Sequence, residues 1–179
     1  GSSLDLRIAE WTLANGYDQA KGSNQNNGLR GYWHADGNIN DVSGNSNNGV
    51  ENGSFGYVAG VWDRAFNFDG KDDFVNISHD EYLNVTGNIT LSVWIHQDKL
   101  SNGVIAFKGL SASDRNFEFS VVSDGDIRFC NDENCHDSEK IPLEDGTLVG
   151  VLREGIWDHL VVTFNEKNKL YYHNGVLIS

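Results

Sequence analysis

The chain has 179 residues and a formal net charge of −13 at pH 7, with 20 Gly, one Pro and no Met. This length fits one domain with a hydrophobic core. The acidic balance argues against a nucleic-acid-binding surface, which needs clustered Lys and Arg, and against docking to anionic lipid. No apolar run reaches the ~20 residues of a membrane span, so we expect no membrane contact by these residues.

Residues 1–30 are predicted to stand apart from the main domain. Gly1-Ser2-Ser3 resembles an expression scar, so a signal peptide or an anchor is expected to have preceded it. Residues 16–30 are polar and rich in turn-forming residues, which is typical of a linker or a surface loop.

The segment 4–15 carries an amphipathic pattern. Leu4, Ile8 and Trp11 fall on one helical stripe. We therefore expect a short N-terminal amphipathic helix. The alternation of Leu4, Leu6 and Ile8 would serve a strand equally well, so that alternative stays open.

From Gly31 onward the sequence alternates short aromatic-rich strands with turns of Asn, Gly, Asp and Ser. In 89–97, alternate residues from Ile89 to Ile95 point one way, while those from Thr90 to His96 point the other. About eleven short strands without helical crossovers predict an all-β, antiparallel two-sheet sandwich. The expected strands lie at 32–33, 50, 55–61, 65–68, 74–77 (with 65–68 and 74–77 as a hairpin-like pair), 89–97, 104–108, 117–122, 127–130, 158–164 and from 171 on.

The two cysteines, Cys130 and Cys135, lie in one short loop. A structural zinc site needs about four ligands, and only His136 and Asp137 are near enough in sequence to add to the thiols. A local disulfide is therefore the favoured interpretation, and it implies an oxidising compartment. Acceptor sequences for N-glycosylation occur at Asn52, Asn76, Asn84 and Asn88.

Six motifs then carry a family resemblance. They are Tyr32-Trp33 with Asp36-Gly37, the segment 41–49, Ala65–Gly70 with Asp72–Val75, Ile89–Ile95, Ile156–Phe164 and Leu170–Leu177. In their order and spacing the chain resembles the laminin-G-like jelly rolls of the concanavalin A-like lectin/glucanase superfamily, in the branch common in bacterial and archaeal surface proteins. The resemblance covers 31–179 and implies a jelly-roll sandwich.

The resemblance also implies strands that this sequence does not contain. After the hairpin at Asn174-Gly175 the family continues with a glycine-rich strand and a strand that fills the centre of a sheet, whereas the sequence ends at Ser179. The domain at 31–179 is therefore expected to lack the family's C-terminal strands. An open sheet edge is usually covered, so residues 4–13 or a neighbouring molecule would supply a strand. Self-assembly through strand or helix donation follows as an expectation.

Calcium is the cofactor that the resemblance suggests. In the related pentraxins the ligands come from an Asp-Asn pair, which would fall at Asp114 and Asn116, and from an acidic loop in the part that is not present here. Calcium needs six to eight oxygen ligands, so this site would be incomplete and we expect no resident cofactor. Asp69, Asp72 and Asp73 form a second acidic cluster, which is more typical of a turn.

Catalysis is not expected. Glycoside hydrolases of this superfamily carry paired carboxylates on one strand face, whereas the acidic segments here fall in turns. We predict a non-catalytic extracellular or cell-surface module for recognition or adhesion, which binds a glycan or protein ligand. The alternative is the head of a type IV pilin-like subunit whose hydrophobic helix has been removed. The expected ligand contacts are Trp62, Tyr171, Tyr172 and His173.

Overall fold

The computed structural model describes residues 6–14, 28–84, 87–111, 114–131, 134–142, 148–165 and 168–179. Within these residues the chain is all-β apart from one short 3₁₀ helix, and no helix has the length and apolarity that crossing a membrane requires. The elements are β1 (Leu6–Ala14), β2 (Leu29–Trp33), β3 (Gly49–Asn52), β4 (Gly56–Ala59), β5 (Arg64–Phe68), β6 (Phe74–Ile77), η1 (Glu81–Leu83), β7 (Ile89–Gln97), β8 (Gly103–Ser111), β9 (Asp114–Val121), β10 (Ile127–Asn131), β11 (Asn134–Asp137), β12 (Ile141–Pro142), β13 (Leu148–Val149), β14 (Trp157–Phe164), β15 (Lys169–His173) and β16 (Val176–Leu177).

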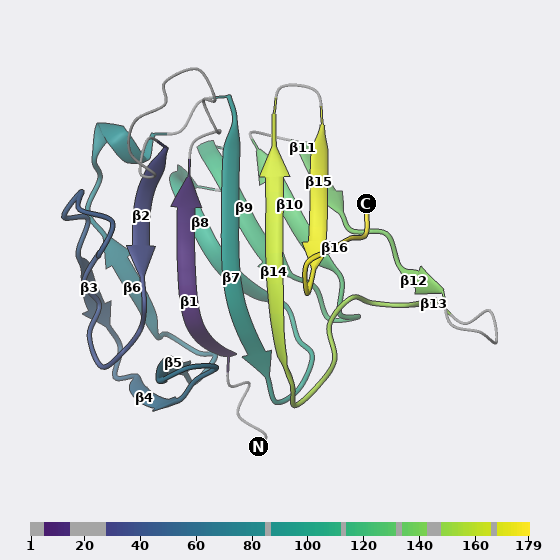
Figure 1. Ribbon diagram of the computed structural model, residues 1–179, viewed down its shortest axis with the longest axis horizontal. Helices are drawn as coiled ribbons and strands as arrows, with labels where there is room; N and C mark the ends of the chain where they lie inside the picture. Colours follow the sequence, from purple (N-terminus) through teal and green to yellow (C-terminus); the bar gives the residue numbers. More distant parts are fainter. Residues whose placement is uncertain are drawn as a thin grey trace.

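The strands form two packed layers (Figure 1). The larger sheet has the order β16-β15-β14-β7-β1-β5-β4, with β2 also paired to β1. The second layer contains the sheet β11-β10-β9-β8 and the pair β3-β6, while β12 and β13 form a small ribbon. All of the pairings are antiparallel, which confirms the predicted class of sandwich.

The core lies between these layers because alternate residues of each strand point inward. Leu91 and Val93 of β7 are almost fully buried, as are Phe119 of β9 and Phe129 of β10. Burying each such side chain is worth about 2 kcal/mol relative to leaving it exposed. The predicted inside/outside alternation is therefore confirmed for 89–95, and Trp94 falls on the outer face of the large sheet. It does not extend to the end of the strand, because His96 and Gln97 are both buried.

The prediction of an N-terminal helix is wrong, because residues 6–14 form the strand β1. One edge of β1 pairs with β7 along its length, and the other edge pairs with β5 and then with β2. Figure 1 shows β1 between β2 and β7, inside the large sheet. The alternation visible at Leu6 and Ile8 prevails because pairing on both sides satisfies the backbone of a strand in this position. The pilin-like alternative depended on a helix in this segment, and the structure has a strand there instead. The large sheet therefore combines a strand from residues 1–30 with strands from 31–179.

The predicted pairing of 65–68 with 74–77 is also wrong. Both strands exist, but β5 pairs with β4 and β1 in the large sheet, whereas β6 pairs with β3 in the other layer. Asp69 and Gly70 therefore begin a crossover between layers instead of a hairpin turn. The expected hairpin at Asn174-Gly175 is confirmed, with φ of 49° and 81° at these residues between β15 and β16.

Asp41 organises the Asn/Gly-rich segment that follows β2. Its carboxylate accepts backbone N–H bonds from Tyr32 and Ser43 at one oxygen (3.0 and 2.8 Å) and from Asn47 at the other (2.9 Å). Burial alone would raise the pKa of Asp41, but a hydrogen bond from the Ser43 side chain, together with the three backbone N–H bonds, holds that pKa below its usual value. The same segment provides Asn47 O as the acceptor for the indole N–H of buried Trp33, at 3.0 Å.

Candidate functional site

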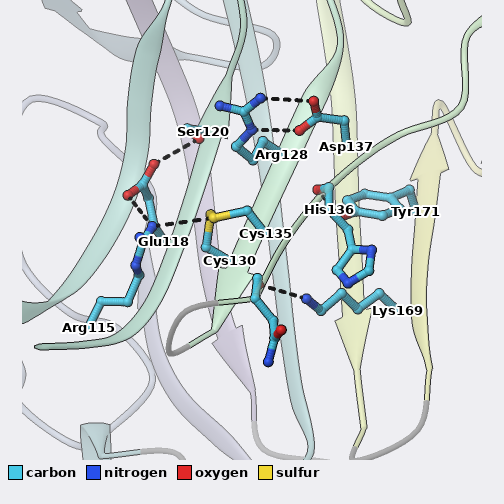
Figure 2. Close-up of a disulfide and its surroundings, with 11 residues drawn as sticks. Arg115, Glu118, Ser120, Arg128, Cys130, Cys135, His136, Asp137, Lys169 and Tyr171 are labelled. Atoms are coloured by element: carbon cyan, nitrogen blue, oxygen red, sulfur yellow. Dashed lines mark hydrogen bonds and ion pairs between the residues drawn. A yellow bond between two sulfur atoms is a disulfide. The ribbon is translucent and has the colours of Figure 1, made fainter. Parts of the chain in front are cut away.

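A disulfide joins Cys130 and Cys135 at directly opposite positions of β10 and β11, which confirms the predicted bridge. On the same two strands Arg128 and Asp137 also lie opposite each other and form a two-pronged ion pair. Figure 2 shows this pair next to the bridge. The ion pair raises the pKa of Arg128 and lowers the pKa of Asp137, because each group stabilises the charged form of the other. The bridge and the ion pair together fix the β10–β11 hairpin.

Tyr171 lies in the core and is not available to a ligand. Its side chain is only 2% exposed. Its hydroxyl donates a hydrogen bond of 2.7 Å to the backbone oxygen of His136, which links β15 of the large sheet to β11 of the other layer (Figure 2). Burial raises the pKa of Tyr171 to about 12. A ligand at the surface therefore does not reach the Tyr171 ring.

His173 is largely covered as well. Its Nε2 donates to Oδ1 of the buried Asp158 at 2.6 Å, and Asn174 donates to the same oxygen at 3.2 Å. These hydrogen bonds offset the free-energy cost of burying the Asp158 carboxylate. His173 is thus part of the framework under the Asn174 turn, and its ring is turned toward Asp158.

Trp62 is the most exposed of the ligand contacts expected from the sequence, with 70% of its surface accessible. The loop between β4 and β5 carries it toward the large sheet, where its ring meets that of Trp94 edge-on at 5.5 Å. Trp94 stacks in turn on His159 of β14, with centroids 4.9 Å apart and planes inclined by 29°. Ser92 Oγ and His159 Nε2 share a hydrogen bond of 2.9 Å.

We call Trp62, Trp94, His159 and Ser92 the aromatic platform. Trp94 and Ser92 alternate along β7 with buried residues, so the platform lies on the solvent face of the large sheet. Tyr172 lies on the same face, because it follows the inward-facing Tyr171 and pairs with Val161. The large sheet thus gathers two of the four expected ligand residues, Trp62 and Tyr172, on one surface.

The sequence did not single out Trp94, Ser92 or His159 as ligand contacts. Strand alternation already places Trp94 and Ser92 outward in 89–97, and His159 outward in 158–164. What the pattern could not supply was the register, which sets His159 directly opposite Trp94. It also could not supply the course of the β4–β5 loop that brings Trp62 beside them.

The calcium ligands suggested by the resemblance are only partly described. Asp114 begins β9, but its side chain lies outside what the structure describes. Asn116 lies on the same strand, and its Oδ1 is buried without a hydrogen-bond donor among the described residues. The assignment of Asp114 and Asn116 as ligands of an incomplete calcium site therefore stays a prediction.

The acidic cluster of Asp69, Asp72 and Asp73 places carboxylate oxygens within 4.8 Å of one another. Two of these carboxylates, those of Asp69 and Asp73, already accept hydrogen bonds from neighbouring residues. Asp73 accepts N–H bonds from Ser54 and Asp69, and Asp69 accepts from the backbone and the ammonium group of Lys71. The hydrogen bond from the Lys71 side chain is the main cause of the lowered pKa of Asp69. These contacts give Asp69 and Asp73 the role of shaping the turn.

Residues 69–179 match the laminin-G family model that is described as the concanavalin A-like lectin/glucanases superfamily. The chain belongs to this family. Comparison with curated proteins and with solved structures gives no match. The laminin-G-like domain is thus assigned by the family model and by its two-layered antiparallel architecture. Domains of this type are generally non-catalytic binding modules, although the superfamily also includes glycosidases.

Proposed function

We propose that this laminin-G-like domain is a non-catalytic recognition module, which binds neutral glycan on the aromatic platform. The observation that carries the proposal is the 70% exposure of Trp62 next to Trp94, which itself stacks on His159. Tryptophan is enriched at interaction sites, because its ring is apolar and its N–H can donate a hydrogen bond.

The chemistry of the platform suits a sugar ring. The ring presents an apolar C–H face that packs on an aromatic ring, and its hydroxyl groups need hydrogen-bonding partners at the edge of that contact. Ser92 and His159 provide a hydroxyl and an imidazole next to the indole of Trp94. The four platform residues contribute rings and a hydroxyl, whereas a glycosidase acts through two carboxylates.

The proposal places the domain in an extracellular or cell-surface protein. Support comes from the Cys130–Cys135 bridge, because disulfides persist in oxidising compartments. The family supports the same location, since laminin-G-like domains are usually extracellular. The formal charge of −13 favours neutral sugars over sulfated or sialylated ones, because like charges repel.

Binding of the wild-type domain to an array of neutral and anionic glycans, with and without calcium, tests the proposal. Trp62→Ala should abolish binding to the neutral glycans that the wild type binds. The matched control is Phe74→Ala, which removes an aromatic ring with similar exposure (52%) from the other layer and should leave binding unchanged. Silence across the array, or equal binding by Trp62→Ala, would contradict the proposal.

A further inference from the structure

The solvent-facing side of the β3–β6 pair presents an exposed aromatic ring. Val75 and Ile77 of β6 pack against the core, so strand alternation turns Phe74 and Asn76 outward. Phe74 is 52% exposed, and Val50, which pairs with Asn76 from β3, is 57% exposed. This orientation follows from the core contacts and from the pairing with β3, whatever lies along the other edge of β6. Single apolar side chains are common on protein surfaces, so the exposure of Phe74 gains a meaning only from the chemistry of its neighbours.

Asn76 begins the sequence Asn-Ile-Ser, which is an acceptor sequence for N-linked sugars. Asn76 and Ser78, the two residues that define the acceptor sequence, are both exposed. Among the described residues, no hydrogen bond reaches the side-chain amide of Asn76 or the hydroxyl of Ser78. The amide is therefore free to carry a substituent, and its outward direction leaves room for a bulky one.

Phe74 lies where a sugar on Asn76 would find a contact. Residues two apart in a strand project from the same face, and a rise of about 3.3 Å per residue puts their Cα atoms roughly 6.6 Å apart. A sugar ring linked to the Asn76 amide therefore comes within reach of the Phe74 ring. The apolar C–H face of the sugar packs on the aromatic ring, while its hydroxyl groups stay in water. Such a contact would cover the part of Phe74 that solvent now reaches.

We propose that Asn76 is an N-glycosylation site and that the first sugar of its oligosaccharide packs on Phe74. This modification is made on exported proteins, so the inference rests on the extracellular location proposed for the domain. It does not rest on glycan binding by the aromatic platform, because the platform lies on the solvent face of the other layer (Figure 1).

The transfer is a substitution at the anomeric carbon of the donor, a saccharide linked through a diphosphate to a polyprenyl lipid. Nδ2 of Asn76 forms the new C–N bond, while the bond from that carbon to the phosphate oxygen breaks. The diphosphate leaves with the bonding electron pair, and the amide loses one proton to a base of the transferase. No group is oxidised or reduced in this step.

Mass spectrometry of the protein isolated from the cells that make it tests the modification. Trypsin leaves Asn76, Asn84 and Asn88 in one peptide, 72–99, so the fragmentation must cleave the backbone and keep the saccharide attached. We expect the mass of a saccharide on Asn76. Ser78→Ala should remove that mass, because the acceptor sequence is lost. An unmodified Asn76 in the wild-type protein would overturn the proposal.

A double-mutant cycle tests the contact with Phe74. In protein from glycosylating cells, Ser78→Ala should raise the equilibrium constant for unfolding about two- to tenfold, because the contact between sugar and ring is lost. In the Phe74→Ala background the same substitution should change nothing, and any general loss of stability in Phe74→Ala cancels in this comparison. The matched control is the same cycle in protein from cells without the transferase, where Ser78→Ala should have no effect. An equal effect in both glycosylated backgrounds would contradict the contact.

Two further outcomes separate this inference from its alternatives. An unmodified Asn76, together with array binding that Trp62→Ala abolishes, would overturn this inference and leave the glycan-recognition proposal intact. A dimer of the glycosylated domain that Phe74→Ala disrupts would assign the exposed ring to a second copy of the chain, and it would overturn the contact with the sugar. NMR gives the direct readout, because sugar protons above the Phe74 ring should shift upfield and should lose that shift in Phe74→Ala.

Discussion

Trp94 of β7 and His159 of β14 lie directly opposite each other in adjacent strands, and their rings stack with centroids 4.9 Å apart on the outer face of the large sheet. Stacked cross-strand pairs add about 0.2–1 kcal/mol to a sheet, so this contact has a structural role. The neighbouring Trp62 has no comparable cover, because it keeps 70% of its surface in solvent. Within the platform, Trp94 and His159 are therefore held by their mutual stacking, whereas the exposed Trp62 is available to contact a ligand.

Asp41→Asn should lower the free energy of unfolding by about 2 kcal/mol, because the new amide nitrogen cannot accept an N–H bond in this turn. Asp41 now accepts three such bonds from the backbone. Urea unfolding at neutral pH measures the loss. An unchanged midpoint would show that these hydrogen bonds contribute nothing to stability.

Asp41 should also make the free energy of unfolding decrease at acidic pH. Its folded pKa is lower than the ordinary value of 3.8, so its contribution is complete above that pH and is lost as the pH falls through the folded pKa. Urea midpoints measured from about pH 6 down to about pH 2 should therefore fall less steeply for Asp41→Asn than for the wild type. Equal slopes would contradict the lowered pKa.

Tyr171 should make the free energy of unfolding decrease at alkaline pH. Its pKa is raised by burial from 10.0 to about 12, so its contribution is complete below pH 10 and is lost as the pH rises through the folded pKa. Tyrosinate absorbance should show a step in which Tyr171 ionises about two pH units late, and Tyr171→Phe should remove that step. Ionisation of all tyrosines near pH 10 in the folded domain would refute the buried position.

Reduction of the Cys130–Cys135 bridge should have a modest effect on stability. The cysteines are five residues apart, and closing so small a ring is worth about 2 kcal/mol by the chain-entropy relation. A thiol assay on the denatured, unreduced protein should find no free thiol. Two reactive thiols would contradict the bridge and remove one support for an extracellular location.

Anionic glycans should bind weakly or not at all. The formal net charge of −13 repels sulfated and sialylated ligands, and the repulsion is strongest at low ionic strength. Affinity for heparin-like chains, measured at low and at physiological salt, checks this expectation. Tight binding that weakens with salt would reveal a basic site and would contradict the preference for neutral sugars.

Much of the fold could be predicted from local patterns. The alternation in 89–97 and 158–164 identifies β7 and β14 and the faces that they bury, because the strand period is two. The Asn174-Gly175 turn follows from residues that tolerate positive φ. The segment 6–14 could not be resolved by pattern alone, since its short apolar series fits a helix and a strand, and only pairing with distant strands decides between them.

The candidate site was harder to predict. Trp62 stands in a loop and draws attention as an exposed aromatic residue, but its partners come from β7 and β14, far along the chain. Tyr171 and His173 looked equally suitable in sequence, yet inward alternation buries the tyrosine, and Asp158 binds the histidine. Such assignments depend on tertiary register, which a single sequence does not encode locally.

The most direct test of glycan recognition is an NMR titration of the five tryptophan indole N–H signals with the neutral oligosaccharide that gives the strongest array signal. We predict that the Trp62 and Trp94 signals shift together and saturate. The Trp33 signal should not move, because its indole is buried and bonded to Asn47. Saturable binding that leaves Trp62 and Trp94 unchanged would contradict the assignment of the platform as the glycan site.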